Sequence, residues 1–268
     1  MSLRNLSKYV PENINEKYYL RIINEKGNIM LQLFDKVRKT ILIYRFLRFR
    51  RGFGVHSPFA FNLITKVIDE RCPYYCFDRI DIIRKQIKYK SEYNYKSLIK
   101  VSHGELLFRL MNYIKPRKIL QIGGDCISSL YYNAYSSGLQ SVLIKEDKKD
   151  AELSDWAFSN MNIKLEKKIG EYSHTLDEVF EDIPIFDFVF FNCSDNSNSI
   201  SELFNKCIKH IHPDTVFVIE GIRDNKNMRL FWNDVKNTSE VVLTFDLYNI
   251  GFVFFNKRLH RKDYIVYF

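Results

Sequence analysis

The stretch that decides the fold of this chain is Lys118-Ile-Leu-Gln-Ile-Gly-Gly-Asp-Cys-Ile127. Residues 118–122 form a short apolar run that Gly123-Gly124 ends, and residues 128–135 behind it are compatible with a helix. A buried strand, a glycine turn and a helix form the first unit of a nucleotide-binding α/β sheet, where glycines let the backbone approach a ligand. An ordinary turn without a ligand has the same pattern, so both interpretations stay open at this point.

An acidic residue follows the next predicted strand. Residues 142–144 are apolar and end in Lys145-Glu146-Asp147. Glu146 lies about 20 residues beyond the glycines, where a carboxylate in such a sheet accepts both hydroxyls of a ribose. The spacing therefore predicts Glu146 as a ribose-binding residue.

Length and composition agree with a globular α/β protein. The 268 residues suffice for one large domain with an N-terminal extension, and the 46% hydrophobic content excludes general disorder. The net charge of +9 leaves phosphate-rich partners open without identifying one. The longest apolar run, residues 41–49, contains Arg45 and Arg48 and is too short to cross a bilayer, so we expect no membrane insertion.

The cysteines and the N-terminus predict a cytoplasmic protein. Five cysteines are present, an odd number, and residues 1–11 lack the apolar core of a secretion signal. Cys72 and Cys76 have no second pair of Cys or His residues close by in the sequence, so we expect no zinc site there.

Apolar runs alternate with helical patterns through most of the chain. They predict five βα units, closed by an antiparallel hairpin of residues 241–247 and 252–256. Residues 264–268 are a candidate for one more edge strand. Ahead of these units, Ser57 and Pro58 form a strong helix start, with a capping hydroxyl followed by proline at the first helical position.

Residues 31–51 are predicted to form a basic amphipathic helix. Such a helix can lie on an anionic membrane, bind nucleic acid, or pack on its own domain with a solvated basic face. We favour packing on the sheet domain.

Four motifs carry a family resemblance, from about Phe34 to Phe268. The chain resembles a bacterial family of class I S-adenosylmethionine-dependent methyltransferases, related in fold to the catechol and caffeoyl-CoA O-methyltransferases. The resemblance implies a Rossmann-like fold with a mostly parallel seven-stranded sheet, a C-terminal antiparallel hairpin and an N-terminal helical extension. It implies two parts, residues 1–100 as the extension and residues 101–268 as the methyltransferase-like domain. The motifs are Gly54-Val-His-Ser-Pro-Phe-Ala-Phe61, Gly104-Glu-Leu-Leu-Phe-Arg-Leu110, Phe186-Asp-Phe-Val-Phe-Phe191 and Asp246-Leu-Tyr-Asn-Ile-Gly-Phe-Val-Phe-Phe255.

The resemblance also implies S-adenosylmethionine as the cofactor and a set of residues around it. The chain departs from the family in that set, because Gln121 replaces an acid and Ile127 replaces a glycine. Gln121 cannot pair with the ammonium group of the cofactor, and Ile127 places a branched side chain where the backbone is expected to approach the ligand. The expected cofactor-binding residues are Ser102, Gly104, Gln121, Gly123, Gly124, Asp125, Glu146 and Asn192.

The positions that hold a divalent metal in catechol-type enzymes have changed further. The resemblance aligns them with Asn192 and Glu220-Gly221, of which only Glu220 is charged, so we expect no metal and keep Glu220 as the one candidate ligand. His56 and His103 are candidates for a catalytic base, since both fall in matched segments and histidine titrates near neutrality. His56 also has a structural interpretation as part of the helix-start motif.

These observations favour an S-adenosylmethionine-dependent methyltransferase that methylates an oxygen of a small-molecule acceptor. The alternative is a methyltransferase-like domain that has lost catalysis and serves as a binding or scaffold protein. The changes at Gln121, Ile127, Asn192 and Gly221 support it. An RNA-modifying or nucleic-acid-binding protein is a second alternative, which rests on the net charge and the basic helix alone. We expect no specific nucleic-acid partner. The acceptor and the oligomeric state are left open.

Overall fold

The computed structural model describes residues 36–49, 51–52, 54–89, 98–136, 138–146, 157–159, 165–192 and 200–268. The chain divides into two compact units, Met1–Arg48 and Phe49–Phe268. In the first, residues 36–48 are helical, within the range predicted for the basic helix. That this helix packs on the sheet domain, and that residues 1–100 act as a separate extension, stay predictions.

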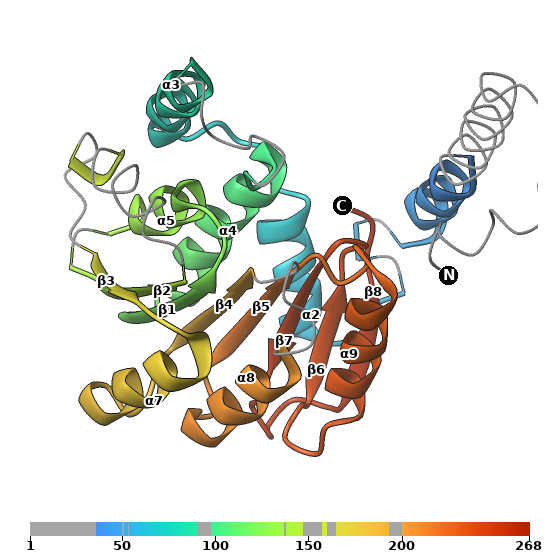
Figure 1. The fold of residues 1–268 in the computed structure, drawn as a ribbon. Helices are drawn as coiled ribbons and strands as arrows, with labels where there is room; N and C mark the ends of the chain where they lie inside the picture. The colour runs from blue at the N-terminus through green and yellow to red at the C-terminus, as the bar shows by residue number, and fades with distance from the viewer. Residues whose placement is uncertain are drawn as a thin grey trace, which may run out of the picture. The chain divides into compact units, whose positions relative to one another are not determined.

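The second unit is built on an eight-stranded sheet with the order β3-β2-β1-β4-β5-β7-β6-β8 (Figure 1). All its strands run parallel except β7, which is antiparallel to both β5 and β6. The predicted closing hairpin is therefore confirmed. The candidate edge strand is present, so the sheet has eight strands where the resemblance implies seven. The strands are β1 (Lys118–Gly123), β2 (Gln140–Lys145), β3 (Glu166–Ile169), β4 (Phe188–Asn192), β5 (Val216–Glu220), β6 (Leu243–Asp246), β7 (Ile250–Phe254) and β8 (Lys262–Ile265).

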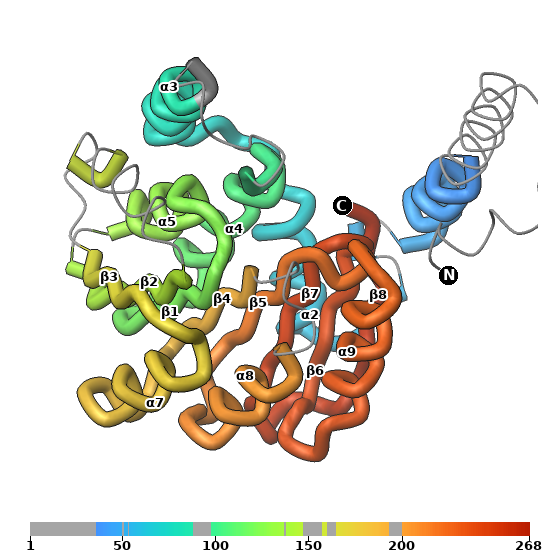
Figure 2. The backbone as a smooth tube through the Cα atoms, in the orientation of Figure 1, coloured from blue at the N-terminus to red at the C-terminus, as the bar shows by residue number. Residues whose placement is uncertain are grey.

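Helices cover both faces of this sheet (Figure 2). Each face has its own apolar core. The apolar run of β4 shows why the strand suits the middle of the sheet. Phe188 and Phe190 enter one core, while Val189 and Phe191 enter the other. The first core is shared by α2 (Pro58–Leu63), the π-helix η3 (Ile64–Ile68), α3 (Tyr75–Tyr89), α4 (Val101–Ile114) and α5 (Cys126–Asn133). The second is shared by α7 (Tyr172–Asp182), α8 (Ile200–Cys207) and α9 (Lys226–Asn237), with the short 3₁₀ turn η6 (Ile208–His210) beside it.

Residues of the first two motifs have clear structural roles. The hydroxyl of Ser57 accepts a hydrogen bond from the Ala60 amide, with Pro58 at the first helical position, as predicted. The buried Arg109 of the second motif donates from Nε to the carbonyl of Val67, 2.9 Å away, in the π-helix. Arg109 thus joins the middle of α4 to the element that follows α2.

The candidate base His103 lies in the first turn of α4, which begins at Val101 and so includes Ser102 and Gly104 as well. The helix ends where Lys115 adopts a left-handed conformation with a φ of 53° ahead of Pro116.

Candidate functional site

The site lies where the chain changes direction across the sheet. From β1 the chain adds β2 and β3 on one side, and β4 with β5 on the other. Ligands of open α/β sheets bind at the carboxyl ends of the strands at such a switch point. Here the switch point is between β1 and β4, where Gly123 pairs with Asn192 (Figure 1).

The two glycines are required by their conformation. Gly123 has a φ of 73° and Gly124 a φ of 75°, in the left-handed region that favours glycine. A Cβ on Gly124 would also lie 2.4 Å from Nδ2 of Asn192. The Asn192 side chain therefore fills the space beneath the turn, and the turn brings bare backbone to the carboxyl edge of the sheet.

Gln121 supports this turn from below. Its side chain is fully buried, and Nε2 donates to the carbonyl of Gly123 at 2.8 Å and to that of Asp125 at 3.1 Å. Its Oε1 accepts a hydrogen bond of 2.8 Å from Ser129 of α5. The polar atoms of Gln121 are thus engaged by the turn, and direct contact of this residue with a cofactor stays a prediction.

Asp125 joins the turn to α4. Its Oδ1 accepts from the amides of Ile127 and Ser128 at the start of α5, and its Oδ2 accepts from the amide of Ile99 at 2.8 Å. Burial raises the pKa of the Asp125 carboxyl, against the hydrogen bonds from these amides, which lower it. Because Ile99 lies two residues ahead of α4, this carboxylate holds the first turn of α4 beside the glycine turn.

Ser102 and Gly104 have different surroundings within that first turn. Ser102 is exposed, and no described side chain caps the helix start, whose N-cap is Lys100. Gly104 is buried against α5, because a Cβ there would lie 2.2 Å from Cε2 of Tyr131. Gly104 is therefore a helix-packing residue, and a further role at the cofactor stays a prediction.

Glu146 follows directly on β2 and is exposed. Its carboxylate has no hydrogen-bond partner among the described residues. Its two acceptor oxygens are therefore available to a ligand at this edge of the sheet.

The candidate base His103 contacts the candidate metal ligand Glu220 in the structure. Nδ1 of His103 lies 2.6 Å from Oε1 of Glu220, at the end of β5, and both side chains are largely buried. His56 is exposed, one residue ahead of the Ser57 cap, which supports its structural interpretation. The sequence predicts His103 and Glu220 as separate candidates, because no local spacing signals a contact across 117 residues.

The loop behind Glu220 is fixed to the turn of the closing hairpin. The amide of Gly221 donates to the carbonyl of Asn249 at 2.8 Å. Both terminal nitrogens of the Arg223 guanidinium donate to the carboxylate of Asp246, at 2.7 and 2.5 Å. One of them also donates to the carbonyl of Tyr248. This clamp, which the sequence analysis did not identify, gives Glu220 a rigid support.

Ile127 lies in the first core rather than at the ligand edge. Its side chain is fully buried, together with those of Leu130 and Tyr131 from the same helix. The expectation that it crowds the approach to a ligand is therefore not supported by its position.

Neither a cluster that could bind a metal ion nor a helix that could span a membrane is present among the described residues. Within those ranges, no three His, Cys, Asp or Glu side chains are grouped so that they could hold a metal ion. No described helix is both long and apolar enough to cross a bilayer.

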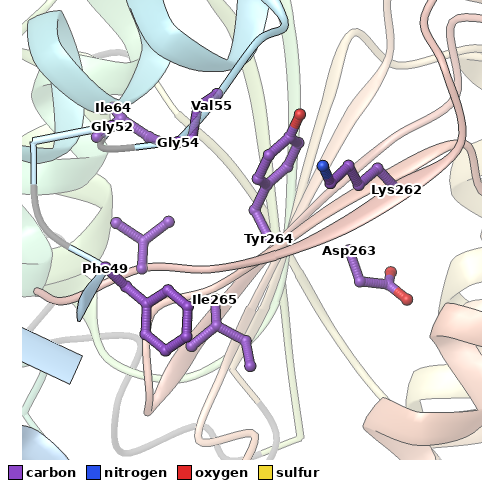
Figure 3. A pocket seen from close by; sticks show the side chains of 10 residues that line it. Phe49, Gly52, Gly54, Val55, Ile64, Lys262, Asp263, Tyr264 and Ile265 are labelled. Atoms are coloured by element: carbon purple, nitrogen blue, oxygen red, sulfur yellow. The ribbon is translucent and has the colours of Figure 1, made fainter. Parts of the chain in front are cut away.

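A cavity of about 220 Å³ lies at β8, where Figure 3 shows the side chains of Phe49, Tyr264 and Ile265. Because β5, β7 and β6 separate β8 from β4, this cavity is remote from the switch point.

Comparison with known proteins agrees with this architecture. No family model matches the sequence, and no curated protein matches it. Among solved structures, an SAH-bound methyltransferase of Podospora anserina has a TM-score of 0.59 at 12% identity, covering 75% of this chain and 97% of its own. The fold is that of the class I methyltransferases.

Two further matches have the same fold. An O-methyltransferase of Bacillus cereus in complex with SAH has a TM-score of 0.54 at 20% identity, over 71% of this chain and 96% of its own. An O-methyltransferase of Streptomyces achromogenes involved in tomaymycin synthesis, in complex with SAM, has a TM-score of 0.53 at 18% identity, over 69% and 91%. At these identities the likeness establishes the fold alone.

Proposed function

We propose that this protein is an S-adenosylmethionine-dependent methyltransferase that acts on a hydroxyl group of a small molecule. The observation that carries the proposal is the left-handed Gly123-Gly124 turn at the switch point, with the available carboxylate of Glu146 after the neighbouring strand. This is the arrangement that a nucleoside with an extended side chain requires: bare backbone for close approach and an acceptor pair for the ribose.

The residues present fit that cofactor. Glu146 would accept from the two ribose hydroxyls, and the backbone of Gly123 and Gly124 would lie under the methionine portion. The amides in the first turn of α4, which have no described side-chain cap, suit the methionine carboxylate. The bound cofactor supplies an electrophilic methyl group, so the protein has mainly to align the acceptor, exclude water and take up a proton.

One observation favours the scaffold alternative. Gln121 stands where the family has an acid, and its amide is used to hold the turn, so the cofactor ammonium has no carboxylate partner there. We infer that this change weakens cofactor binding without abolishing it, since Glu146 remains. A scaffold protein would instead bind neither the cofactor nor its product.

Transfer of a radioactive methyl group to a panel of phenols, catechols and aliphatic alcohols tests the proposal. The panel includes 4-methylphenol and the more acidic 4-nitrophenol, and each acceptor is assayed with and without a chelator. We expect transfer that the chelator leaves unchanged, because Asn192 and Gly221 remove two of the carboxylates that a metal would need. Loss of transfer on chelation, restored by magnesium, would show that Glu220 and its neighbours bind a metal after all.

A further inference from the structure

The contact between His103 and Glu220 fixes the form of the imidazole. Ionised Glu220 only accepts hydrogen bonds, so beside it the Nδ1 atom of His103, 2.6 Å from Oε1, carries the proton that this oxygen receives. In the neutral ring, Nε2 then holds the free lone pair. Nε2 has no hydrogen-bond partner among the described residues, so the basic nitrogen is left available.

The position of Glu220 beside His103 has a cost in stability. Its Oε2 is buried and has no hydrogen-bond partner in the described part of the chain. A buried carboxylate oxygen without a partner is unfavourable, and native structures seldom keep one without a reason. The clamp between Arg223 and Asp246 holds the loop that follows Glu220.

The helix turn that carries His103 is also tied to the glycine turn. Asp125 of the glycine turn accepts from the Ile99 amide, which leads directly into the helix turn that carries His103. The ring of Phe268 lies 5.9 Å from the imidazole, and the guanidinium of Arg71 lies 5.4 Å from that ring. An apolar ring thus shields one side of the base, beside the turn that we assign to the cofactor.

We propose that His103 is the general base that takes the proton of the acceptor hydroxyl, and that Glu220 is the residue that positions it. This inference rests on the proposed function. It gives a histidine–carboxylate pair the role that a metal has in catechol-type enzymes. The hydroxyl proton moves to Nε2 of His103 while a lone pair of the acceptor oxygen forms the bond to the methyl carbon. The electron pair of the carbon–sulfur bond stays on sulfur, which becomes a neutral thioether, and the imidazolium then releases its proton to water.

The tautomer is tested first, in the protein without cofactor. The chain has six histidines, and in ¹⁵N-histidine-labelled protein the signal lost in His103→Gln identifies His103 by NMR. We expect a proton on Nδ1 and none on Nε2 in the neutral ring, and loss of this preference in Glu220→Ala, which removes the acceptor. A neutral ring protonated on Nε2 in the wild type would overturn the proposal, since no lone pair would then face the acceptor.

Activity provides the second arm. We expect His103→Gln to lower transfer to 4-methylphenol by about 100- to 10,000-fold. Transfer to 4-nitrophenol, which ionises without help, should fall far less, a difference that a merely structural role would not produce. His174→Gln is the matched control, because His174 forms an exposed pair with Glu178 at 3.3 Å, outside the site.

Titration with S-adenosylhomocysteine separates the two possible failures. The first failure concerns the base alone. If wild type and His103→Gln bind S-adenosylhomocysteine equally, and the variant lowers transfer to both phenols to the same extent or to neither, the assignment of the base is wrong. The proposed function then still stands. If the wild type does not bind it, or transfers methyl to no acceptor of the panel, the proposed function fails and this inference fails with it.

Discussion

Gly104 of α4 and Tyr131 of α5 approach so closely that no side chain fits between them. A Cβ on Gly104 would lie 2.2 Å from Cε2 of Tyr131, and the tyrosine ring is fully buried. The glycine of the second motif therefore sets the distance between the two helices that flank the glycine turn.

We expect Gly104→Ala to destabilise the fold by about 1–3 kcal/mol, the usual cost of overpacking a core, as measured by urea unfolding. Gly138→Ala is the control, because the nearest atom to a Cβ at that position is Oγ of Ser136 at 4.0 Å. Equal stability of the two variants would mean that α4 and α5 separate freely.

Restoring the family acid at position 121 should harm the turn. In Gln121→Glu an ionised carboxylate would face the carbonyls of Gly123 and Asp125, which now receive hydrogen bonds, and we expect a loss of about 1–3 kcal/mol at pH 7. Burial would raise the pKa of the new carboxyl, so stability should recover as pH falls and the neutral group becomes a donor. Gln121→Met is the control, with a loss that does not change with pH. A Glu variant as stable as the wild type at pH 7 would contradict the turn-supporting role.

Ile127 should matter for stability and not for the ligand. Its side chain is fully buried in the first core, so we expect Ile127→Val to cost about 0.5–1.5 kcal/mol and Ile127→Ala about 2–5 kcal/mol in chemical unfolding. Binding of S-adenosylhomocysteine to Ile127→Val should change less than twofold. Markedly tighter binding would show that the branched side chain crowds the cofactor.

Asp187 should contribute to stability above pH 4 and lose that contribution in acid. Burial raises the pKa of its carboxyl, but hydrogen bonds from the amides of Arg117 and Lys118 and from the ring of His212 outweigh burial, and the pKa is lowered from 3.8. A lowered pKa stabilises the folded protein above the unfolded value, and that stabilisation disappears as pH falls through the folded value. The urea midpoint of the wild type should therefore drop more steeply between about pH 5 and pH 3 than that of Asp187→Asn. Parallel curves would refute this.

The pattern of apolar runs was sufficient for the architecture. Alternating strands and helices, the very apolar β4 and the hairpin around Gly251 predicted the order of the elements and the reversed strand, because each is a local signal. The start of α4 carries no such local signal, because its N-cap residue, Lys100, makes no side-chain capping hydrogen bond.

The site could be predicted only in part. The glycine turn and Glu146 follow from spacing along the chain, whereas the pair of His103 and Glu220 depends on which strands become neighbours. The roles of Gln121 and Asp125 were equally hidden, since a polar residue that binds a ligand and one that supports a turn are identical in sequence. Only the partners of their side-chain atoms distinguish the two.

Calorimetric titration with S-adenosylhomocysteine tests the central claim most directly. We predict a binding heat for the wild type, with a loss of affinity of about 10- to 100-fold in Glu146→Ala, the usual effect of removing a charged hydrogen-bond partner. Glu181→Ala, which changes an exposed acid on α7, should bind like the wild type. Binding should also raise the melting temperature, because a ligand at a hundredfold excess over Kd stabilises the fold by about 2.7 kcal/mol. No heat and no shift at millimolar ligand would contradict the account and leave the scaffold alternative.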